Sequence, residues 1–184
     1  MTNAMRDLLQ TNRTWLGQML DLLANTRDEH YSSSPAGLEP HRAGGHLRHI
    51  LDFYECFLAG LARGSIDYDA RQRDPNVESD RAAAIRKTQR MFSRLAEVEN
   101  LEYDKRLWVK VEASEGLGLL GNFVLSTVGR ELQVLSSHTV HHFALMAVTL
   151  RLLGADVPCD FGVAPSTLLH HARRSDGEMR GEAA

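Results

Sequence analysis

The sequence predicts an all-α protein, an antiparallel bundle of four helices. Apolar residues recur with a period of about 3.6 in four stretches of the chain, and turn-forming residues separate those stretches. A chain of 184 residues is ample for one core of this kind. We therefore expect a single domain over residues 1–172 and a flexible polar tail over residues 173–184.

A turn-forming segment separates the first two helices. Leucine, methionine and tryptophan residues follow the helical period between Thr2 and Arg27. Residues 32–37, with serines, a proline and a glycine, interrupt the period. It resumes with Ile50 and continues to Gly64, so the second helix carries histidines near its start.

The third helix precedes a stretch of different character. A turn signal at residues 74–76 is followed by the helical period from about Ser79 to Glu99, with Ala83, Ile85, Met91, Leu95 and Val98 as its expected inner positions. Residues 107–112 then alternate as a strand does, residues 114–118 are turn-like, and residues 119–125 are apolar. This pattern predicts a long crossover between the third and fourth helices, either a short β-hairpin or an extended loop.

The fourth helix has clear signals at both ends. Ser126 or Thr127 is the expected N-cap, and Gly154 ends the helix after Leu153. In a bundle of this kind, sites are built from side chains on facing helices.

Composition narrows the classes of function. Lys and Arg number 21 against 24 Asp and Glu, so no basic surface for nucleic acid is expected. The most apolar stretch, Phe143 to Leu153, falls well short of the roughly 20 residues that span a bilayer. The first ten residues lack a signal-peptide layout. We expect a soluble cytoplasmic protein with a small-molecule ligand or substrate and without nucleic-acid or membrane partners, and a homodimer is one option for its assembly.

Histidines are the most informative residues of the chain. His138 and His142 stand four apart in the fourth predicted helix, a spacing at which two imidazoles share one face and can bind one metal ion. At about 100° per residue, His142 lies about 40° and His141 about −60° from His138. His46 and His49 lie in the second predicted helix, so a third imidazole can come from there.

Metal binding explains these histidines better than simple core packing. Several neutral imidazoles on inner helix faces would each need a buried hydrogen-bond partner, whereas one metal ion satisfies them together. Three protein ligands with one open position are typical of a catalytic metal. Imidazole ligands suit zinc, nickel, copper or iron(II). Glu131 extends the inner stripe of the fourth helix, where it either orients a ligand or acts as a base, or is simply a charge at the end of the bundle. His141 flanks the site.

Three motifs resemble the DinB-like (YfiT-type) family of metal-dependent four-helix-bundle proteins. They are residues 45–53, which read GHLRHILDF, residues 137–142, which read SHTVHH, and residues 152–154, which read LLG. The resemblance covers all four predicted helices. It implies a ligand triad of one histidine early in the second helix and an HxxxH pair in the last helix.

The HxxxH pair corresponds to His138 and His142. For the remaining ligand, both His46 and His49 are available. Family members usually follow this ligand with an apolar residue and then an acidic residue five or six positions on, which favours His49 with Glu55 over His46. The family includes thiol-dependent transferases and isomerases, iron-dependent sulfoxide synthase domains and members without an assigned reaction.

Residues 68–74 and 161–167 also resemble motifs of an uncharacterised bacterial branch of this family. In one interpretation of the first motif, Arg71 and Arg73 form ion pairs with nearby aspartates or helix ends. In the other, the loop covers the open metal position and an arginine holds an anionic substrate bidentately. Tyr68, Arg71 and Arg73 are therefore candidate substrate-binding residues.

Two functions are consistent with these observations. The first is a metal-dependent enzyme, thiol-transferase-like or hydrolase-like, in which zinc, nickel or iron(II) lowers the pKa of a bound water or of a low-molecular-weight thiol. The second is a non-catalytic, stress-related protein that binds a metal or small ligand. The sequence contains no Ser-His-Asp arrangement, phosphate-binding glycine loop or dinucleotide motif, and it names no catalytic side chain.

Overall fold

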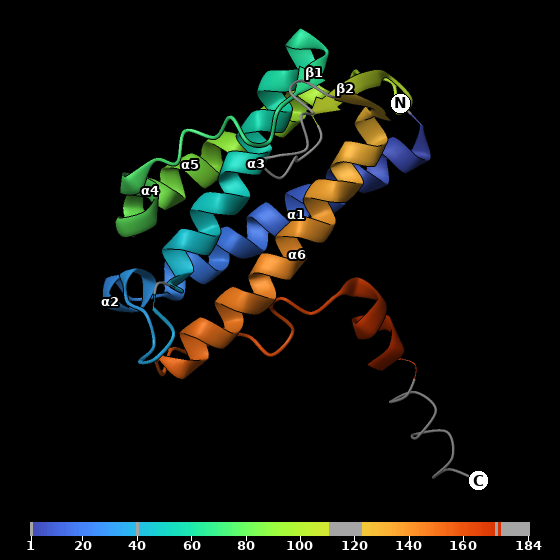
Figure 1. Ribbon diagram of the computed structural model, residues 1–184. Helices are drawn as coiled ribbons and strands as arrows, with labels where there is room; N and C mark the ends of the chain where they lie inside the picture. The colour runs from blue at the N-terminus through green and yellow to red at the C-terminus, as the bar shows by residue number, and fades with distance from the viewer. Residues whose placement is uncertain (1, 40, 111–122, 172, 174–184) are drawn as a thin grey trace, which may run out of the picture.

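The computed structural model describes residues 2–39, 41–110, 123–171 and 173. It is mostly helical, with a small three-stranded sheet. In chain order the elements are α1 (Asn3–Asn25), α2 (Asp28–Ser32), α3 (Ala43–Arg63), β1 (Ser65–Ile66), α4 (Pro75–Ser79), α5 (Arg81–Arg94), η1 (Leu95–Val98), β2 (Arg106–Lys110), β3 (Phe123–Thr127) and α6 (Val128–Leu152). Figure 1 shows α1, α3, α5 and α6 packed along one another.

The four predicted helices correspond to α1, α3, α5 with η1, and α6, and the predicted signals act at their ends. Thr127 caps α6 by accepting a hydrogen bond from the backbone N–H of Arg130 at 3.2 Å. Gly64 follows α3 and Gly154 follows α6, both in the left-handed region, with φ of 72° and 78°. Glycine adopts this conformation without steric cost, so each residue ends its helix.

Ion pairs show that α3 and α5 run parallel. Asp52 of α3 pairs with Lys87 of α5 at 3.2 Å. About one turn further along both helices, Glu55 pairs with Arg90 at 3.1 Å. Asp52 is 1% exposed and Lys87 7% exposed. A buried charge without its partner is costly, so these pairs strongly favour one register between the two helices.

Hydrogen bonds and ring contacts show the relative directions of the other helix pairs. Asn12 of α1 donates a hydrogen bond to the carbonyl of Leu132 in α6 at 3.0 Å, and Trp15 donates to Ser136 at 2.9 Å, so α1 and α6 are parallel. In contrast, α3 and α6 are antiparallel, because the imidazole rings of α3 meet those of α6 in reverse order.

The expected antiparallel arrangement therefore holds for some neighbours only. It holds for α3 with α6, and also for α1 with α5, where Met19 meets Thr88 and the earlier end of α5 meets the later end of α1. It fails for α1 with α6 and for α3 with α5. The physical reason is the connection of residues 64–80, which returns along α3 so that α5 begins at the end where α3 begins (Figure 1).

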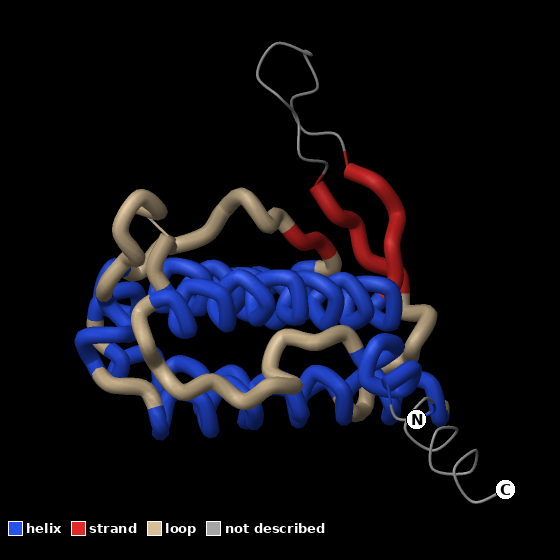
Figure 2. The backbone as a smooth tube through the Cα atoms, turned by 90° about the horizontal axis from the view of Figure 1, so that it is seen from below, coloured by secondary structure: helices blue, strands red, loops and turns tan. Residues whose placement is uncertain are grey.

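The stretch between α5 and α6 carries the predicted hairpin. β2 pairs antiparallel with β3 and parallel with β1, in the order β1-β2-β3. Figure 2 shows the three strands gathered at one end of the helices. The stretch between α5 and α6 begins and ends at the same end of the helices. The segment that runs along the length of the helices is instead residues 64–80, between α3 and α5. The turn expected at residues 114–118 lies outside the described residues.

The interior of α5 differs from the expected pattern. Met91, Leu95 and Val98 are buried as predicted, but Ala84 and Thr88 take the places expected of Ala83 and Ile85. The shift follows from the buried ion pair of Lys87 with α3, which turns this charged residue inward.

Among the described residues, no helix is both long and apolar enough to cross a membrane.

The tail expected over residues 173–184 lies outside the described residues apart from Arg173. Residues 161–167, the second motif, begin with Phe161, which is buried and stacks on Phe143 of α6 at 4.4 Å between ring centroids. A further helical segment begins at Pro165. The first part of this motif therefore contributes to the core.

We expect Gly44→Ala to destabilise the protein by about 1–3 kcal/mol, the usual range for overpacking. A Cβ atom at Gly44 would overlap the backbone carbonyl of Glu78 in α4, which cannot move away as a flexible side chain can. Gly17→Ala in α1 is the matched control, because a Cβ atom there meets nothing within 4 Å. The control should gain about 0.5–1 kcal/mol from reduced backbone freedom. Equal free energies of unfolding in urea for the two variants would contradict the close α3–α4 contact.

Candidate metal centre

Three imidazoles from two helices converge between α3 and α6. His49 comes from α3, and His138 and His142 come from α6, where their four-residue spacing places them on one face. Each offers one ring nitrogen, and these nitrogens lie within 4.8 Å of one another. The ring centroids of His49 lie 4.8 Å and 4.6 Å from those of His138 and His142. The three histidines therefore form a group that can hold a metal ion.

The other two candidate histidines lie beside this group. The Nδ1 atom of His46 lies 3.1 Å from the Nδ1 atom of His142, so one of the two carries the shared hydrogen. The His46 ring also stacks on His41, with 5.9 Å between centroids. His141 is exposed, and its ring packs edge-on against His142 at 5.0 Å. Thus His46 approaches the three-histidine group through His142, and His141 flanks it.

An arginine from the connection between α3 and α5 meets the same group. Nη1 of Arg71 lies 2.6 Å from Nδ1 of His49. Its guanidinium carbon lies 5.5 Å from the centroid of the Phe53 ring, within the range of a cation–π contact. Phe53 in turn stacks on His138 at 3.9 Å and on Tyr68 at 4.8 Å between centroids. Phe53 therefore packs between the histidines and this connection.

Glu131 has a structural partner for each carboxylate oxygen. It is 4% exposed and accepts hydrogen bonds from the hydroxyl of Tyr68 at 2.8 Å and of Ser126 at 2.5 Å. These bonds satisfy a buried carboxylate that would otherwise be costly. Glu131 thereby fixes the position of Tyr68, and it is not part of the three-histidine group.

A cavity of about 450 Å³ opens beside the histidines. Its lining residues are His49, Phe53, Tyr68, Asp69, Arg71, Lys110 and His138. Two of the three candidate substrate-binding residues, Tyr68 and Arg71, therefore border it. Arg73 is exposed, has a positive φ of 52°, and does not line it.

The interpretation in which the two arginines pair with nearby aspartates is not supported. Asp69 lies 3.8 Å from Lys110, and Asp74 accepts a hydrogen bond from the N–H of Asn76 at 3.0 Å as the cap of α4. Within the described part of the chain, no ion pair includes Arg71 or Arg73.

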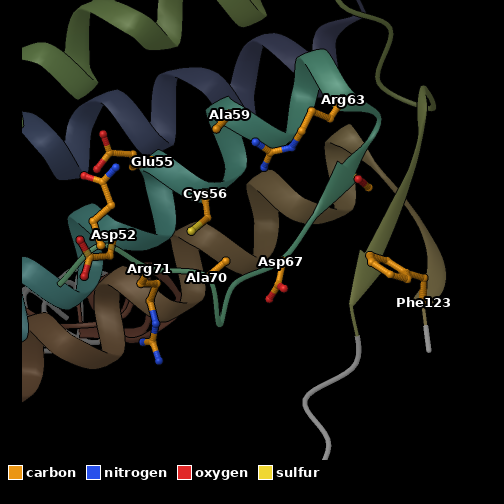
Figure 3. A pocket seen from close by; sticks show the side chains of 11 residues that line it. Asp52, Glu55, Cys56, Ala59, Arg63, Asp67, Ala70, Arg71 and Phe123 are labelled. Carbon is orange, nitrogen blue, oxygen red and sulfur yellow. The ribbon is translucent and has the colours of Figure 1, made fainter. Parts of the chain in front are cut away.

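A second cavity, of about 400 Å³, lies along α3, and Arg71 lines both this cavity and the first. Figure 3 shows it, with Asp52, Glu55, Cys56 and Ala59 along α3 and the guanidinium of Arg71 directed away from Cys56. Burial, followed by the nearby Asp52 carboxylate, raises the pKa of the Cys56 thiol, so this cysteine is held in its neutral form.

Burial keeps the imidazoles neutral, the form in which they donate a lone pair to a metal. It lowers the pKa of His49 to about 4, with the positive charge of Arg71 adding to the effect. Burial and then His141 lower the pKa of His138 to about 4, and burial and then His49 lower that of His142 to about 3. The pKa of His46 is also lowered, first by burial and then by His41.

The donor set fits a transition-metal ion. The Nε2 atom of His138 is buried and has no hydrogen-bond partner among the described residues. A buried ring nitrogen without a partner is costly, and coordination to a metal would remove this cost. Three neutral imidazoles favour zinc, nickel, copper or iron(II) over magnesium or calcium, which prefer oxygen ligands.

Sequence reasoning missed two residues of this site. The helical period marks Phe53 only as one apolar residue of the second helix, although its position four residues after His49 places it on the same face of α3. That spacing was the available signal. Lys110 enters the cavity from β2, and its approach depends on how the sheet packs against the connection, for which the sequence has no local signal.

The fold and the site define a mostly helical protein in which three histidines from two helices can hold a metal ion. The model of the DinB family matches residues 1–167, and the chain belongs to this family. The chain is also similar to a protein named FK506-binding protein 5 from Rhizopus delemar, with 33% identity over 105 residues. That match covers 57% of this chain and 27% of the length of the relative.

We expect the metal-free protein to lose stability as the pH falls from about 6.5 toward 4. In the unfolded chain the histidines take up protons near pH 6.5, whereas folded His49 and His138 do so only near pH 4. The unfolded state therefore binds more protons in this interval, and the stability of the fold rises with pH there. Thermal melts with chelator at pH 7 and pH 5 should differ by several degrees. A melting temperature that is the same at both values would contradict the buried, neutral state of these imidazoles.

Proposed function

We propose that this DinB-family chain binds one divalent transition-metal ion through His49, His138 and His142, within a four-helix bundle of the YfiT type. The ion is zinc, nickel or iron(II). The observation that carries the proposal is the convergence of three ring nitrogens, within 4.8 Å of one another, from two antiparallel helices. The unpartnered Nε2 atom of His138 supports it.

We propose further that the site is catalytic and acts with a low-molecular-weight thiol, as a transferase-like or hydrolase-like enzyme. The cavity beside the histidines supports an open coordination position, because a small molecule has room to reach the group. A metal ion would supply deprotonation of a bound thiol or water. No cysteine of the chain is then required as the nucleophile.

The residues around the cavity have separate parts in this proposal. Tyr68, fixed by Glu131, and the ring of Phe53 stack on one another and form the aromatic part of the cavity lining beside the histidines. Arg71 contributes a positive charge at the cavity that no carboxylate of the described residues pairs with, whereas Lys110 is paired with Asp67 and Asp69. A substrate with a negatively charged group is therefore favoured over a cationic one.

One observation favours the alternative, a protein that binds metal without catalysis. The Nδ1 atom of His46 lies 3.1 Å from that of His142, so a fourth imidazole is present next to the three-histidine group. Four protein ligands would close the coordination shell, as in structural sites. The metal affinity of a His46→Ala variant distinguishes the two functions.

We expect the purified protein to bind about one metal ion per chain, and His49→Ala, His138→Ala and His142→Ala each to abolish tight binding. Loss of one of three ligands leaves too few donors for a stable complex. His141→Ala is the matched control and should weaken binding little, because its ring lies outside the group. Elemental analysis and titration of the stripped protein with zinc measure both quantities.

His46→Ala tests the closed shell. An affinity as low as that of the His49 variant would favour four ligands and the non-catalytic function. Substoichiometric metal together with no titration of the stripped wild type would refute the metal site itself.

We expect a low-molecular-weight thiol to bind the metal directly. In the cobalt-substituted protein, addition of bacillithiol, mycothiol, glutathione or cysteine should produce a sulfur-to-metal charge-transfer band, because a metal-bound thiol is deprotonated at neutral pH. The His142→Ala variant, exposed to cobalt in the same way, is the control for bands from free complexes. If no thiol alters the cobalt spectrum or supports transfer to an electrophile, the thiol-dependent reaction is excluded.

A further inference from the structure

The hydrogen bond between Arg71 and His49 restricts which nitrogen of His49 is available. A guanidinium group carries only donors, so the Nδ1 atom of His49, 2.6 Å from Nη1, must accept. A neutral imidazole that accepts at Nδ1 carries its hydrogen on Nε2. In this arrangement neither nitrogen has a free lone pair for a metal ion.

Metal binding by His49 therefore requires the hydrogen bond between Arg71 and His49 to break. If the metal ion takes Nδ1, it replaces the guanidinium directly. If it takes Nε2, the ring hydrogen moves from Nε2 to Nδ1, and Nδ1 can no longer accept from Arg71. Neither case changes the number of protons on the ring, and in both cases the guanidinium loses this acceptor.

Arg71 has no other strong acceptor once released. Within the described residues no carboxylate lies within ion-pair distance of it, and its Nε atom is buried without a hydrogen-bond partner. The second cation at the cavity differs, because Lys110 is paired with Asp67 at 2.9 Å and with Asp69 at 3.8 Å. Arg71 is thus the uncompensated positive charge at the cavity beside the histidines.

We infer that Arg71 couples metal binding to the binding of a small carboxylate, and this inference rests on the proposed metal site. In the metal-free protein the guanidinium is held by His49 and by the face of Phe53. In the metal-bound protein it is free to bind a carboxylate bidentately in the cavity that it lines. Because coupling is reciprocal, the carboxylate also tightens the binding of the metal.

This coupling favours one order of binding, in which the metal binds before the carboxylate. A carboxylate-bearing ligand that arrives before the metal must compete with His49 for the guanidinium. One that arrives after the metal meets a guanidinium without an acceptor. The substrate class that the site favours is a small molecule with a carboxylate at one end and a metal-binding group at the other.

The test compares zinc affinity in wild type, Arg71→Met and Arg73→Met, measured by competition with a chromophoric chelator. Methionine keeps much of the length of the side chain and removes the donors and the charge. We expect Arg71→Met to bind zinc about tenfold tighter than wild type, because no hydrogen bond to His49 must break. Arg73→Met removes the same charge two residues away, at an exposed position outside the cavity, and should match wild type.

Acetate is the probe for the anion, with chloride at equal ionic strength as its control. Acetate should tighten zinc binding about fivefold in wild type and in Arg73→Met, within the usual range of coupling. It should have no such effect in Arg71→Met. An equal effect of acetate in Arg71→Met would mean that the anion binds the metal without Arg71, and would overturn the inference.

Nitrogen-15 NMR of the histidine rings gives a readout without metal. His49 should carry its hydrogen on Nε2 in the metal-free wild type and lose this preference in Arg71→Met. Equal zinc affinity in both proteins, or the same tautomer in both, overturns the inference while the proposed metal site stands. If neither protein binds zinc, the metal site fails and the inference fails with it.

Discussion

The antiparallel packing of α3 against α6 is the constraint on which the site depends. His138 and His142 share a face of α6 whatever the rest of the chain does, because a helix repeats every 3.6 residues or so. Only the register with α3 determines which imidazole meets them. That register is also supported by an adjacent part of the α3 surface, where the buried Asp52 pairs with Lys87 of α5. A shift of α3 by one turn would break this ion pair as well as the histidine group.

The buried ion pairs therefore have a positional role as well as an energetic one. Asp52 accepts from Arg48 at 2.8 Å in addition to Lys87, and Arg48 reaches Glu78 of α4 at 3.1 Å. Surface ion pairs contribute little, but removal of one partner of a buried pair is strongly destabilising. This network connects α3, α4 and α5, and it includes Arg48, directly before His49, and Asp52, three residues after it.

Helical periodicity was sufficient to predict much of this molecule from its sequence. The extents of α1, α3 and α6, the caps at Thr127 and Gly154, and the shared face of His138 and His142 all follow from local spacing. The parallel course of α3 and α5 did not follow, because it depends on the path of the connection between them. Residues 65–80 contain two residues of β1 and the short helix α4, elements too small to leave a periodic signal. The same limit applies to Arg71, whose contact with His49 is set by this connection.

The division between helices and connection has a chemical consequence. The histidines are on long helices whose packing holds their ring nitrogens within 4.8 Å of one another, which favours a fixed coordination geometry. Arg71 is on a connection, where the chain is anchored by Tyr68 on one side and by the cap of α4 on the other. A guanidinium on such a segment can turn between acceptors without moving the helices. In the proposed function, the scaffold would separate the histidines, which stay fixed to bind the metal, from Arg71, which would change partner when the metal binds.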